Sequence, residues 1–407
     1  MEANKIFKMT TALILLVMAT TSCKKTVTEI VIELSTLTLE MSRTATLKVL
    51  PVFDQYVTWT TSNPNVVTVM SARDLNLQVE GNPWFTGVVT AIAEGRATIT
   101  ATTKNGLTAT CEISVTNDKD VYVAGYEGND DSRIAKLWKN GISQNLTDGT
   151  KDAIASSVFV SGNDVYVAGQ EFNGSAYVAK LWKNGVPQNL TDGANYAIAN
   201  SVYVSDGDVY VAGREFNGST AYVAKFWKNG VPQNLTDGTR WAEAYSVFVS
   251  ANDVYVAGEE GGVAKLWKNG TAQELSDKYS RANSVFVSDK NVYVAGLERD
   301  ERYHPIAKLW KNGVPQNLTN ASESLGATSV FVSGNDVYVA GYFLWKNGIL
   351  QKADCWANSV FIIGNDVYVA GGDGDFGSNV AILCKNGVEQ NLTDGIKKAE
   401  AYSVFVK

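Results

Sequence analysis

Carboxylates are the residues of this chain best suited to acid–base chemistry. A pair that cleaves a glycan needs two unlike carboxyl groups about 5–9.5 Å apart. The candidate glutamates instead recur after similar apolar runs in successive copies of one unit, which indicates a structural position. They are Glu171, Glu215, Glu259 and Glu260. No nucleophile motif is present in the sequence. We therefore favour a non-enzymatic protein without cofactors, and keep a glycan hydrolase or lyase that uses loop carboxylates as the alternative.

Metal ligands are scarce. His304 is the one histidine of the chain, which excludes most histidine-based catalysis and zinc sites built from several imidazoles. Two acidic runs, 129–131 and 373–375, offer oxygen atoms to Ca²⁺, but neither resembles a full coordination loop. Other aspartates recur in Gly-Asn-Asp, where turn structure favours them. These are Asp164, Asp336 and Asp366. We expect no metal site.

Aromatic side chains beside polar ones are the strongest binding signal. Flat apolar rings with polar neighbours suit sugar rings or protein hot spots. The alternative is that each ring packs under its own loop. The aromatics fall in two sets of connections between expected strands: Phe172, Tyr177, Phe216, Tyr222, Tyr303, Phe343 and Phe376 in one, and Tyr196, Trp241, Tyr279 and Trp356 in the other.

A repeated unit positions these residues. Val-Tyr-Val-Ala-Gly occurs seven times from Val121 to Val367, and Ser-Val-(Phe/Tyr) occurs seven times from Ser157 to Ser403. A Trp-Lys-Asn-Gly turn lies between them, with Cys384 in place of Trp in the seventh copy. Such spacing matches a four-stranded propeller blade. We name its strands A (Ser-Val-Phe-Val), B (Val-Tyr-Val-Ala-Gly), C (Ala-Lys-Leu-Trp) and D (Gln-Asn-Leu-Thr), with D as the polar outer edge and Asn-Gly as a type I′ turn between C and D.

The order of the strands predicts how the ring closes. The first copy starts at strand B, whereas 403–407 is a strand A with no strand B after it. We expect this strand to pair beside 121–125 and complete blade 1; Ile113–Val115 competes for that place. A horseshoe solenoid is the other repeat architecture, but it needs no hairpin turns of this kind. The chain resembles β-propellers common in lipoproteins of gut-type bacteria, yet its blade motif lacks the WD-repeat, kelch and sialidase Asp-box signatures. The resemblance implies fold and location, and no activity.

Comparison of the copies predicts a binding face. The A–B turns have constant length and the C–D turns are Lys-Asn-Gly, whereas the B–C and D–A connections vary in length and sequence. Variable loops on a constant scaffold usually carry function. We therefore expect a glycan or protein ligand on the B–C/D–A side, which we call the variable face. The candidate ligand-binding residues are Phe172, Phe216, Trp241, Arg299, Tyr303, His304, Tyr342, Phe343 and Trp356.

One part of this face is expected to be hollow. Only 30 residues separate Val337 from Val367, because blade 6 has almost no B–C loop. Blade 5 has a long loop at 297–305 and blade 7 has one at 372–379. A blade with short loops between two blades with long loops predicts a notch on the variable face. Tyr342, Phe343 and Trp356 would form its base, and such a concave surface is typical of a small-ligand site. The alternative is a blade that lost loop residues without consequence.

Residues 27–117 form a different unit. Apolar and polar residues alternate there with period two, which is typical of strands with one buried face. The stretches 57–69, 87–91 and 95–102 resemble the bacterial group 2 Ig-like family. The resemblance implies a stalk or adhesion module without catalytic residues, and we expect Trp59 in its core.

The N-terminus reads as an export signal. Lys5 and Lys8 precede an apolar run at 10–19 that is too short to span a bilayer. Small residues then lead into Cys23, an arrangement that resembles the lipobox of bacterial lipoproteins. A plain secretory signal with an incidental cysteine is the alternative. We expect a signal peptide at 1–22, lipidation at Cys23 and a tether at 23–26.

These features together predict an all-β lipoprotein with an Ig-like β-sandwich (27–117) and a seven-bladed β-propeller (118–407). It would lie in the bacterial cell envelope, on the outer membrane, facing the periplasm or the outside. The net charge of −7 argues against nucleic acid as a partner. We expect a monomer held to the membrane by lipid. Apart from Cys23, each cysteine is expected to be a small buried apolar residue: Cys111, Cys355 and Cys384.

Overall fold

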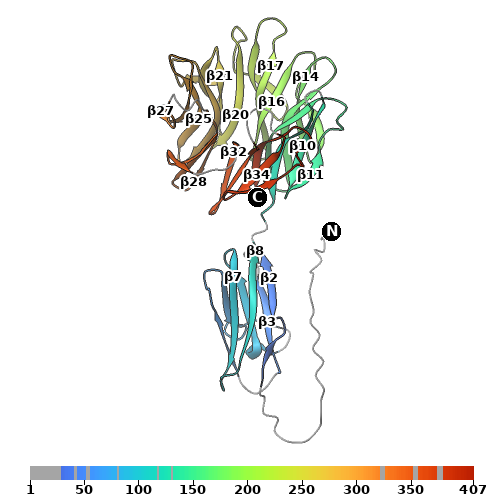
Figure 1. Cartoon of the computed structure of the whole chain (residues 1–407), viewed down its shortest axis with the longest axis vertical. Helices are drawn as coiled ribbons and strands as arrows, with labels where there is room; N and C mark the ends of the chain where they lie inside the picture. Colours follow the sequence, from blue (N-terminus) through green and yellow to red (C-terminus); the bar gives the residue numbers. More distant parts are fainter. Residues whose placement is uncertain are drawn as a thin grey trace, which may run out of the picture. The chain divides into compact units, whose positions relative to one another are not determined.

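The structure is a computed structural model, in which residues 29–40, 44–51, 56–79, 82–116, 119–129, 132–320, 326–351, 356–373 and 379–407 are described. Cys23, Cys355 and Phe376 lie outside these residues, as do the expected signal peptide and parts of both acidic runs. The chain divides into two units after Asp118 (Figure 1). No helix of the described residues is long and apolar enough to cross a membrane.

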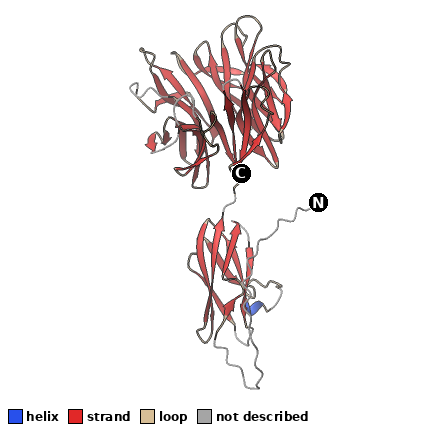
Figure 2. Cartoon of the chain, turned by 45° about the vertical axis from the view of Figure 1, so that its right-hand side comes forward, coloured by secondary structure: helices blue, strands red, loops and turns tan. Residues whose placement is uncertain are grey.

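The first unit is a sandwich of two four-stranded sheets, in the orders β1-β3-β6-β5 and β2-β8-β7-β4. Its strands are β1 (Val31–Ile32), β2 (Thr36–Glu40), β3 (Thr44–Leu50), β4 (Val57–Thr61), β5 (Val67–Ser71), β6 (Thr86–Ala91), β7 (Gly95–Thr103) and β8 (Thr108–Thr116). Apolar side chains of both sheets alternate inward, and Trp59 packs against this core as expected. The one helical element among the described residues is η1 (Pro83–Phe85), so the fold is all-β (Figure 2).

The described residues of the second unit form seven four-stranded sheets, each with its strands in the order A-B-C-D. Blade 1 contains β36 (Ala399–Val406), β9 (Val121–Asn129), β10 (Ser132–Lys139) and β11 (Ile142–Asn145). Blade 2 contains β12 (Ala153–Ser161), β13 (Asp164–Phe172), β14 (Tyr177–Lys183) and β15 (Val186–Asn189); blade 3 contains β16 (Ala197–Ser205), β17 (Asp208–Phe216), β18 (Tyr222–Lys228) and β19 (Val231–Asn234).

The remaining blades follow the same plan. Blade 4 contains β20 (Ala242–Ser250), β21 (Asp253–Glu260), β22 (Val263–Lys268) and β23 (Thr271–Glu274); blade 5 contains β24 (Ser280–Ser288), β25 (Asn291–Arg299), β26 (Pro305–Lys311) and β27 (Val314–Asn317). Blade 6 contains β28 (Ala327–Ser333), β29 (Asp336–Gly341), β30 (Leu344–Lys346) and β31 (Ile349–Gln351); blade 7 contains β32 (Trp356–Ile363), β33 (Asp366–Gly372), β34 (Ala381–Lys385) and β35 (Val388–Asn391).

The C-terminal strand closes the ring, as the strand order predicts. β36 runs antiparallel to β9 with Val404 opposite Val123, and every A strand contacts the A strand of the next blade. In each of the seven interfaces a serine Oγ of one A strand accepts a hydrogen bond from a valine N–H of the next, at 3.1–3.3 Å. These bonds satisfy N–H groups that point away from strand B. The fold is therefore a closed β-propeller.

A large side chain fills the space between neighbouring blades. The tryptophan of each Trp-Lys-Asn-Gly segment is fully or almost fully buried. Trp182, for example, packs with residues of β9, β10 and β12. Cys384 takes this place in blade 7, buried against blade 6. Cys384 is disulfide-bonded, which corrects the expectation of a simple apolar side chain, whereas Cys111 is free and buried as expected.

Aromatic rings line the centre of the propeller. Each A strand supplies one half-buried ring, and neighbouring ring centroids are 4.7–5.0 Å apart around the whole circle. The rings are those of Phe159, Tyr203, Phe248, Phe286, Phe331, Phe361 and Phe405. We call this circle the aromatic collar. Because Phe405 belongs to β36, the collar is complete only when the ring is closed.

The A and B strands are longer than their motifs. In blade 2 a register shift between Ala155 and Ser157 bends strand A toward strand B. A Cβ on Gly169 would lie 2.0 Å from the Ile154 carbonyl oxygen, so the bend requires the glycine of Val-Tyr-Val-Ala-Gly. Strand A therefore begins at Ala153, four residues before the expected Ser157, and strand B continues to Phe172.

Candidate functional site

The face with the A–B and C–D turns has nearly the same contacts in every blade. In blade 2, Asn184 accepts a hydrogen bond from the Val165 N–H and donates one to Asp164, and Lys183 lies 2.8 Å from the same carboxylate. Hydrogen bonds from Lys183 and Asn184 lower the pKa of Asp164. Equivalent pairs involve Asp120, Asp208, Asp253, Asp336 and Asp366. These aspartates hold the hairpins, in agreement with the turn interpretation.

Most glutamates that follow strand B have a structural role too. Glu171 pairs with Lys180 at 2.8 Å across strands B and C, and Glu215 pairs with Lys225. Glu260 takes this position in blade 4 with Lys265. Glu259 does not belong to this set, because it directly follows Gly258 and therefore aligns with Gln170 and Arg214. Grouping it with the repeated glutamates was wrong.

Glu243 and Glu259 lie opposite each other on β20 and β21. Glu243 has a counterpart in Glu400 of blade 1, whereas Glu259 has none in the other blades. Glu243 is 5% exposed and accepts hydrogen bonds from Asn200 at 2.9 Å and from Arg214 at 2.6 Å, both on blade 3. Burial raises the pKa of Glu243, although Arg214 acts to lower it. The pair Arg214–Glu243 thus joins two blades through a buried charge contact.

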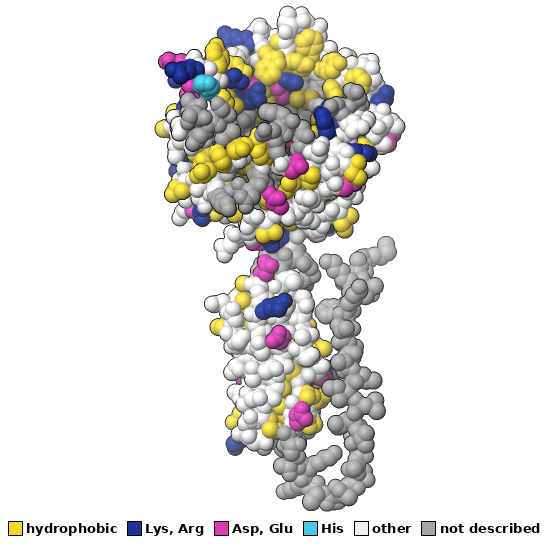
Figure 3. Space-filling view, in the orientation of Figure 1, with side chains coloured by type: hydrophobic (Ala, Val, Ile, Leu, Met, Phe, Trp, Pro, Cys, Tyr) yellow, Lys and Arg dark blue, Asp and Glu magenta, His cyan; other side chains and the backbone are white. Residues whose placement is uncertain are grey.

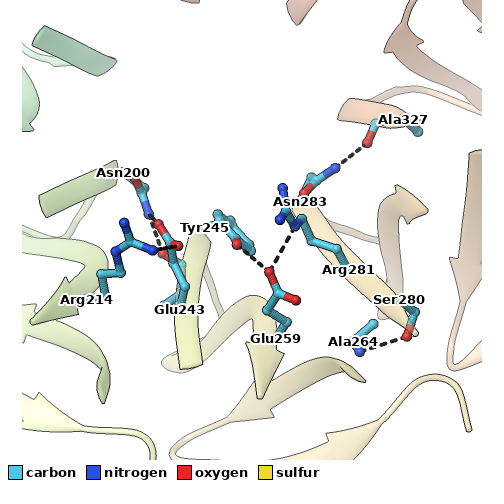
Figure 4. A network of polar contacts seen from close by, with 11 residues as sticks. Asn200, Arg214, Glu243, Tyr245, Glu259, Ala264, Ser280, Arg281, Asn283 and Ala327 are labelled. Atoms are coloured by element: carbon cyan, nitrogen blue, oxygen red, sulfur yellow. Dashed lines mark hydrogen bonds and ion pairs between the residues drawn. The ribbon is translucent and has the colours of Figure 1, made fainter. Parts of the chain in front are cut away.

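Glu259 is 1% exposed and holds a second guanidinium. It accepts hydrogen bonds from the Tyr245 hydroxyl at 2.5 Å and from Arg281 Nε of blade 5 at 2.9 Å (Figure 4). Burial, together with the carboxylates of Glu243 and Glu259, raises the pKa of Tyr245. Both carboxylates therefore orient arginines, and their burial leaves little access for a substrate.

A pocket of about 280 Å³ opens between blades 2 and 3 on the variable face. Its lining residues are Gln170, Tyr177, Tyr196, Ala197, Ile198, Arg214 and Tyr222. Tyr196 is 43% exposed, and its ring centroid lies 6.0 Å from that of Tyr177. The Arg214 guanidinium carbon lies 4.2 Å from the Tyr222 ring centroid. The pocket thus presents three aromatic rings and a fixed cation.

Contacts below the pocket fix the Tyr177 ring. Its hydroxyl donates a hydrogen bond of 2.6 Å to Asp152, which also accepts bonds from Arg133 Nε and Nη2. Burial acts to raise the pKa of Asp152, but the hydrogen bonds from Arg133 and Tyr177 lower it. The Tyr177 hydroxyl is therefore engaged with the scaffold, while the residue lines the pocket.

The expected site residues of blades 2 and 3 do not line this pocket, but each contacts a residue that does. Phe172 and Phe216 end β13 and β17, and each pairs with the tyrosine that begins strand C, with ring centroids 5.4 Å apart. The sequence analysis placed both residues in B–C connections, but the structure places them in strands. Trp241 is half-buried, with the Arg214 guanidinium carbon 5.4 Å from its ring centroid. The rings of Phe172 and Phe216 therefore pack locally, beside the tyrosines that line the pocket.

The expected residues of blade 5 lie together in a second group. The Arg299 guanidinium carbon lies 5.0 Å from the Tyr279 ring centroid, and Arg299 Nη1 donates a hydrogen bond to the Tyr303 carbonyl. Tyr303 is 68% exposed. His304 Nδ1 lies 3.4 Å from Asp300 Oδ2. Figure 3 shows the histidine among basic and acidic side chains.

The expected residues of blade 6 form a third group. The Tyr342 ring centroid lies 4.9 Å from that of Phe343 and 4.7 Å from that of Trp356, in edge-to-face contacts. Trp356 begins β32, opposite Gly372, so it belongs to strand A and not to the D–A loop. Most of the expected wall at 372–379 lies outside the described residues. The nine expected residues thus fall into three groups on the variable face.

Sequence reasoning missed the network of Glu243, Tyr245, Glu259 and Arg281. Its members lie in the extensions of strands A and B beyond their motifs. Aligning the copies on the glycine of strand B would have separated Glu259 from the repeated glutamates. Among the described residues, no group of three potential metal-ligating side chains occurs.

Known proteins resemble parts of this chain. Residues 26–113 match the bacterial Ig-like domain (group 2), which confirms the resemblance of the first unit. Lacto-N-biosidase of Bifidobacterium bifidum is 43% identical over 68 residues. That match covers 17% of this chain and 5% of the enzyme, so the chain spans only a small part of its relative.

Solved structures resemble the chain at low identity. A prolyl endopeptidase has 13% identity and a TM-score of 0.40, over 78% of this chain and 49% of that one. The β-propeller domain of the Trilobed protease from Pyrococcus furiosus has 12% identity and a TM-score of 0.40, over 75% and 96%. TolB from Acinetobacter baumannii has 9% identity and a TM-score of 0.38, over 76% and 80%. At identities this low, the similarity concerns the fold alone and gives no information about the function of this chain.

Proposed function

We propose that this protein is a lipid-anchored binding protein of the bacterial cell envelope, whose propeller binds a glycan through its variable face. The export signal and Cys23 support the anchor, and the Ig-like domain would act as a spacer. A monomer on the outer membrane, facing the periplasm or the outside, fits this role. The anchor rests on sequence, whereas the binding role rests on the propeller.

The pocket between blades 2 and 3 is the observation that carries the binding role. It lies where the copies differ, and its rings of Tyr177, Tyr196 and Tyr222 stand beside the Arg214 guanidinium. A concave site with aromatic walls and few polar groups is the usual form of a small-ligand site. Sugar rings suit such walls because their apolar faces stack on aromatic rings while their hydroxyls reach polar groups. A protein ligand is the other possible occupant of this face.

Retention on a polysaccharide panel tests the proposal. We expect the purified protein to be retained by at least one polysaccharide and Tyr196→Ala to lower that affinity by about tenfold, since removing a buried aromatic contact costs more than 1 kcal/mol. Tyr56→Ala is the matched control, because Tyr56 is 49% exposed on the Ig-like unit. No retention by any polysaccharide, or equal losses in both variants, would contradict a glycan site in the pocket.

Glycan hydrolysis is the second candidate. Burial raises the pKa of Glu243, as a general acid requires, and Glu259 lies opposite it on the next strand. Against this role, both side chains are buried and bonded to arginines, which leaves little access for a substrate. The similarity to part of lacto-N-biosidase is compatible with a glycan as ligand. The same panel decides between the two, since hydrolysis requires reducing ends to appear with time and to disappear in Glu243→Gln and Glu259→Gln. Retention without product supports binding alone.

A further inference from the structure

The arginines of the propeller unit are confined to its variable face. All six lie at the ends of strands or in connections on that side: Arg133, Arg214, Arg240, Arg281, Arg299 and Arg302. The repeated ion pairs of the opposite face use lysine instead. Arginine differs from lysine in its planar fork, which binds a carboxylate through two hydrogen bonds and stacks on aromatic rings.

Four of these arginines share one arrangement. Their guanidinium carbons lie 4.2–5.5 Å from a tyrosine ring centroid: Arg133 over Tyr126, Arg214 over Tyr222, Arg281 over Tyr245 and Arg299 over Tyr279. In three of the four, a carboxylate oxygen also bonds a guanidinium nitrogen. The nitrogen–oxygen distances are 2.6 Å to Asp152, 2.6 Å to Glu243 and 2.9 Å to Glu259. A stacked arginine on this face is therefore normally paired with an acid.

Arg299 is the exception. Its hydrogen bond to the Tyr303 carbonyl is 3.4 Å long, and no carboxylate among the described residues pairs with it. Its Nε is buried without a partner, as is that of Arg214, whose Nη1 however bonds Glu243. The neighbouring acids are already engaged, since Glu298 bonds Lys308 and Asp300 accepts the N–H groups of Arg302 and His304. A buried N–H without an acceptor costs free energy that an incoming acceptor recovers.

We propose that Arg299 binds a carboxylate of the ligand, so that the ligand is an acidic glycan with uronic or similar sugars. This inference rests on the proposed glycan-binding function and names its ligand class. Tyr279 and Tyr303, both exposed, supply rings on which the sugar packs, and His304 provides a further polar group. The net charge of −7 does not oppose this, because charges beyond about 10 Å are screened at 0.1 M salt.

Two polymers that differ only in charge test the inference. Polygalacturonate presents a carboxylate on every sugar, and its methyl ester presents none. We expect the parent protein to bind polygalacturonate at least tenfold more tightly than the ester, as the loss of a charged hydrogen bond implies. Arg299→Gln should lower the affinity for polygalacturonate by about tenfold or more. Arg299→Lys should recover only part of it, because lysine keeps the charge but not the fork.

Arg302→Gln is the matched control, because it removes the same charge from the same connection, where Arg302 is exposed and stacks on no ring of the described residues. Its affinity should stay within about twofold of the parent, since an isolated exposed charge contributes little. Thermal melting of each variant separates a binding defect from a folding defect.

Several results would overturn the inference. These are no binding of polygalacturonate by the parent, equal binding of the ester, equal binding of dextran sulfate, or an Arg299→Gln variant that binds as the parent does. Retention of neutral polysaccharides that depends on Tyr196 but not on Arg299 would leave the proposed function in place and refute only the acidic ligand.

Discussion

Ser403 Oγ accepts a hydrogen bond of 3.1 Å from the N–H of Val158, and the two residues are 245 positions apart in the chain. The bond has the same form as the one between Ser246 and Val285 inside the ring, at 3.2 Å. The closing interface is thus built like the internal ones. The contact between blades 1 and 2 therefore uses the same serine–valine hydrogen bond as the contact between any two neighbouring blades.

Removal of the closing strand should open the ring. Deleting 404–407 removes the part of β36 that lies opposite 121–123 of β9, and with it the Phe405 ring of the aromatic collar. We expect a large drop in melting temperature and aggregation through the exposed strand, measured by thermal melting and size-exclusion chromatography. Ser403→Ala and Ser246→Ala should each cost only about 1 kcal/mol. A truncated protein that melts as the parent does and stays monodisperse would contradict closure by β36.

The lipid anchor is tested at Cys23, which lies outside the described residues. Cys23→Ala should prevent incorporation of labelled fatty acid and release the protein from the membrane fraction, because the proposed lipobox makes this thiol the acceptor of the lipid. Cys111→Ala is the control, since Cys111 is free and buried in the Ig-like unit. Continued labelling of Cys23→Ala would refute the lipobox.

The aromatic group of blade 6 competes with the pocket as the ligand site. Phe343→Ala with Trp356→Ala removes two of its three rings. If the expected notch binds glycan, the double variant should lose retention on the polysaccharide panel while keeping its circular dichroism spectrum. The pocket variant Tyr196→Ala is the comparison. A double variant that binds like the parent would leave the notch as a short blade only.

Acid should destabilise the A–B and C–D turns through their aspartates. Hydrogen bonds from lysine and asparagine lower the pKa of Asp164, Asp208 and Asp253 below the usual 3.8. Their stabilising contribution is present above about pH 4 and is lost as the pH falls through the lowered folded-state values. Replacing all three by Asn should reduce the loss of melting temperature between pH 5 and pH 3. Equal losses in parent and variant would show that these pairs do not contribute.

The sequence Ala-Glu-Ala-Tyr-Ser occurs twice, so Glu243 of blade 4 can be compared with Glu400 of blade 1. Glu243 pairs with Arg214, whereas Glu400 accepts a hydrogen bond from Asn358 and has no cationic partner among the described residues. Glu243→Gln should cost about 3 kcal/mol in urea unfolding, because it leaves a partly buried guanidinium unpaired. Glu400→Gln should cost less than about 1 kcal/mol. Equal losses would show that the Arg214–Glu243 pair is not the stabilising element.

The repeats made most of the fold predictable. Seven copies of strand B and seven of strand A required the C-terminal strand to complete blade 1, and β36 does so. Asn-Gly predicted the C–D turns, and Asn184 has φ of 52° as a type I′ turn requires. Periodicity within the units was sufficient for these features because they are local.

The buried charge network was not predictable in the same way. Arg214 and Glu243 are 29 residues apart and meet only because neighbouring blades stack. The A-strand bulge also shifts which residues face the axis, so Glu243 and Tyr245 could not be placed from the Ser-Val-Phe motif alone. The role of Glu259 was misjudged because Glu260 beside it continues the repeated pattern.

Every interface repeats one serine–valine bond, and six of the seven also bury a tryptophan, so the blades are closely equivalent units. Unequal recombination between copies would add or remove a whole blade without creating an unfamiliar junction, since each A strand already fits the next. Blade number can then change between relatives faster than blade structure, with the size of the aromatic collar as the remaining constraint. The variable face, in contrast, would be reshuffled with each exchange, which gives this architecture a simple route to new ligands.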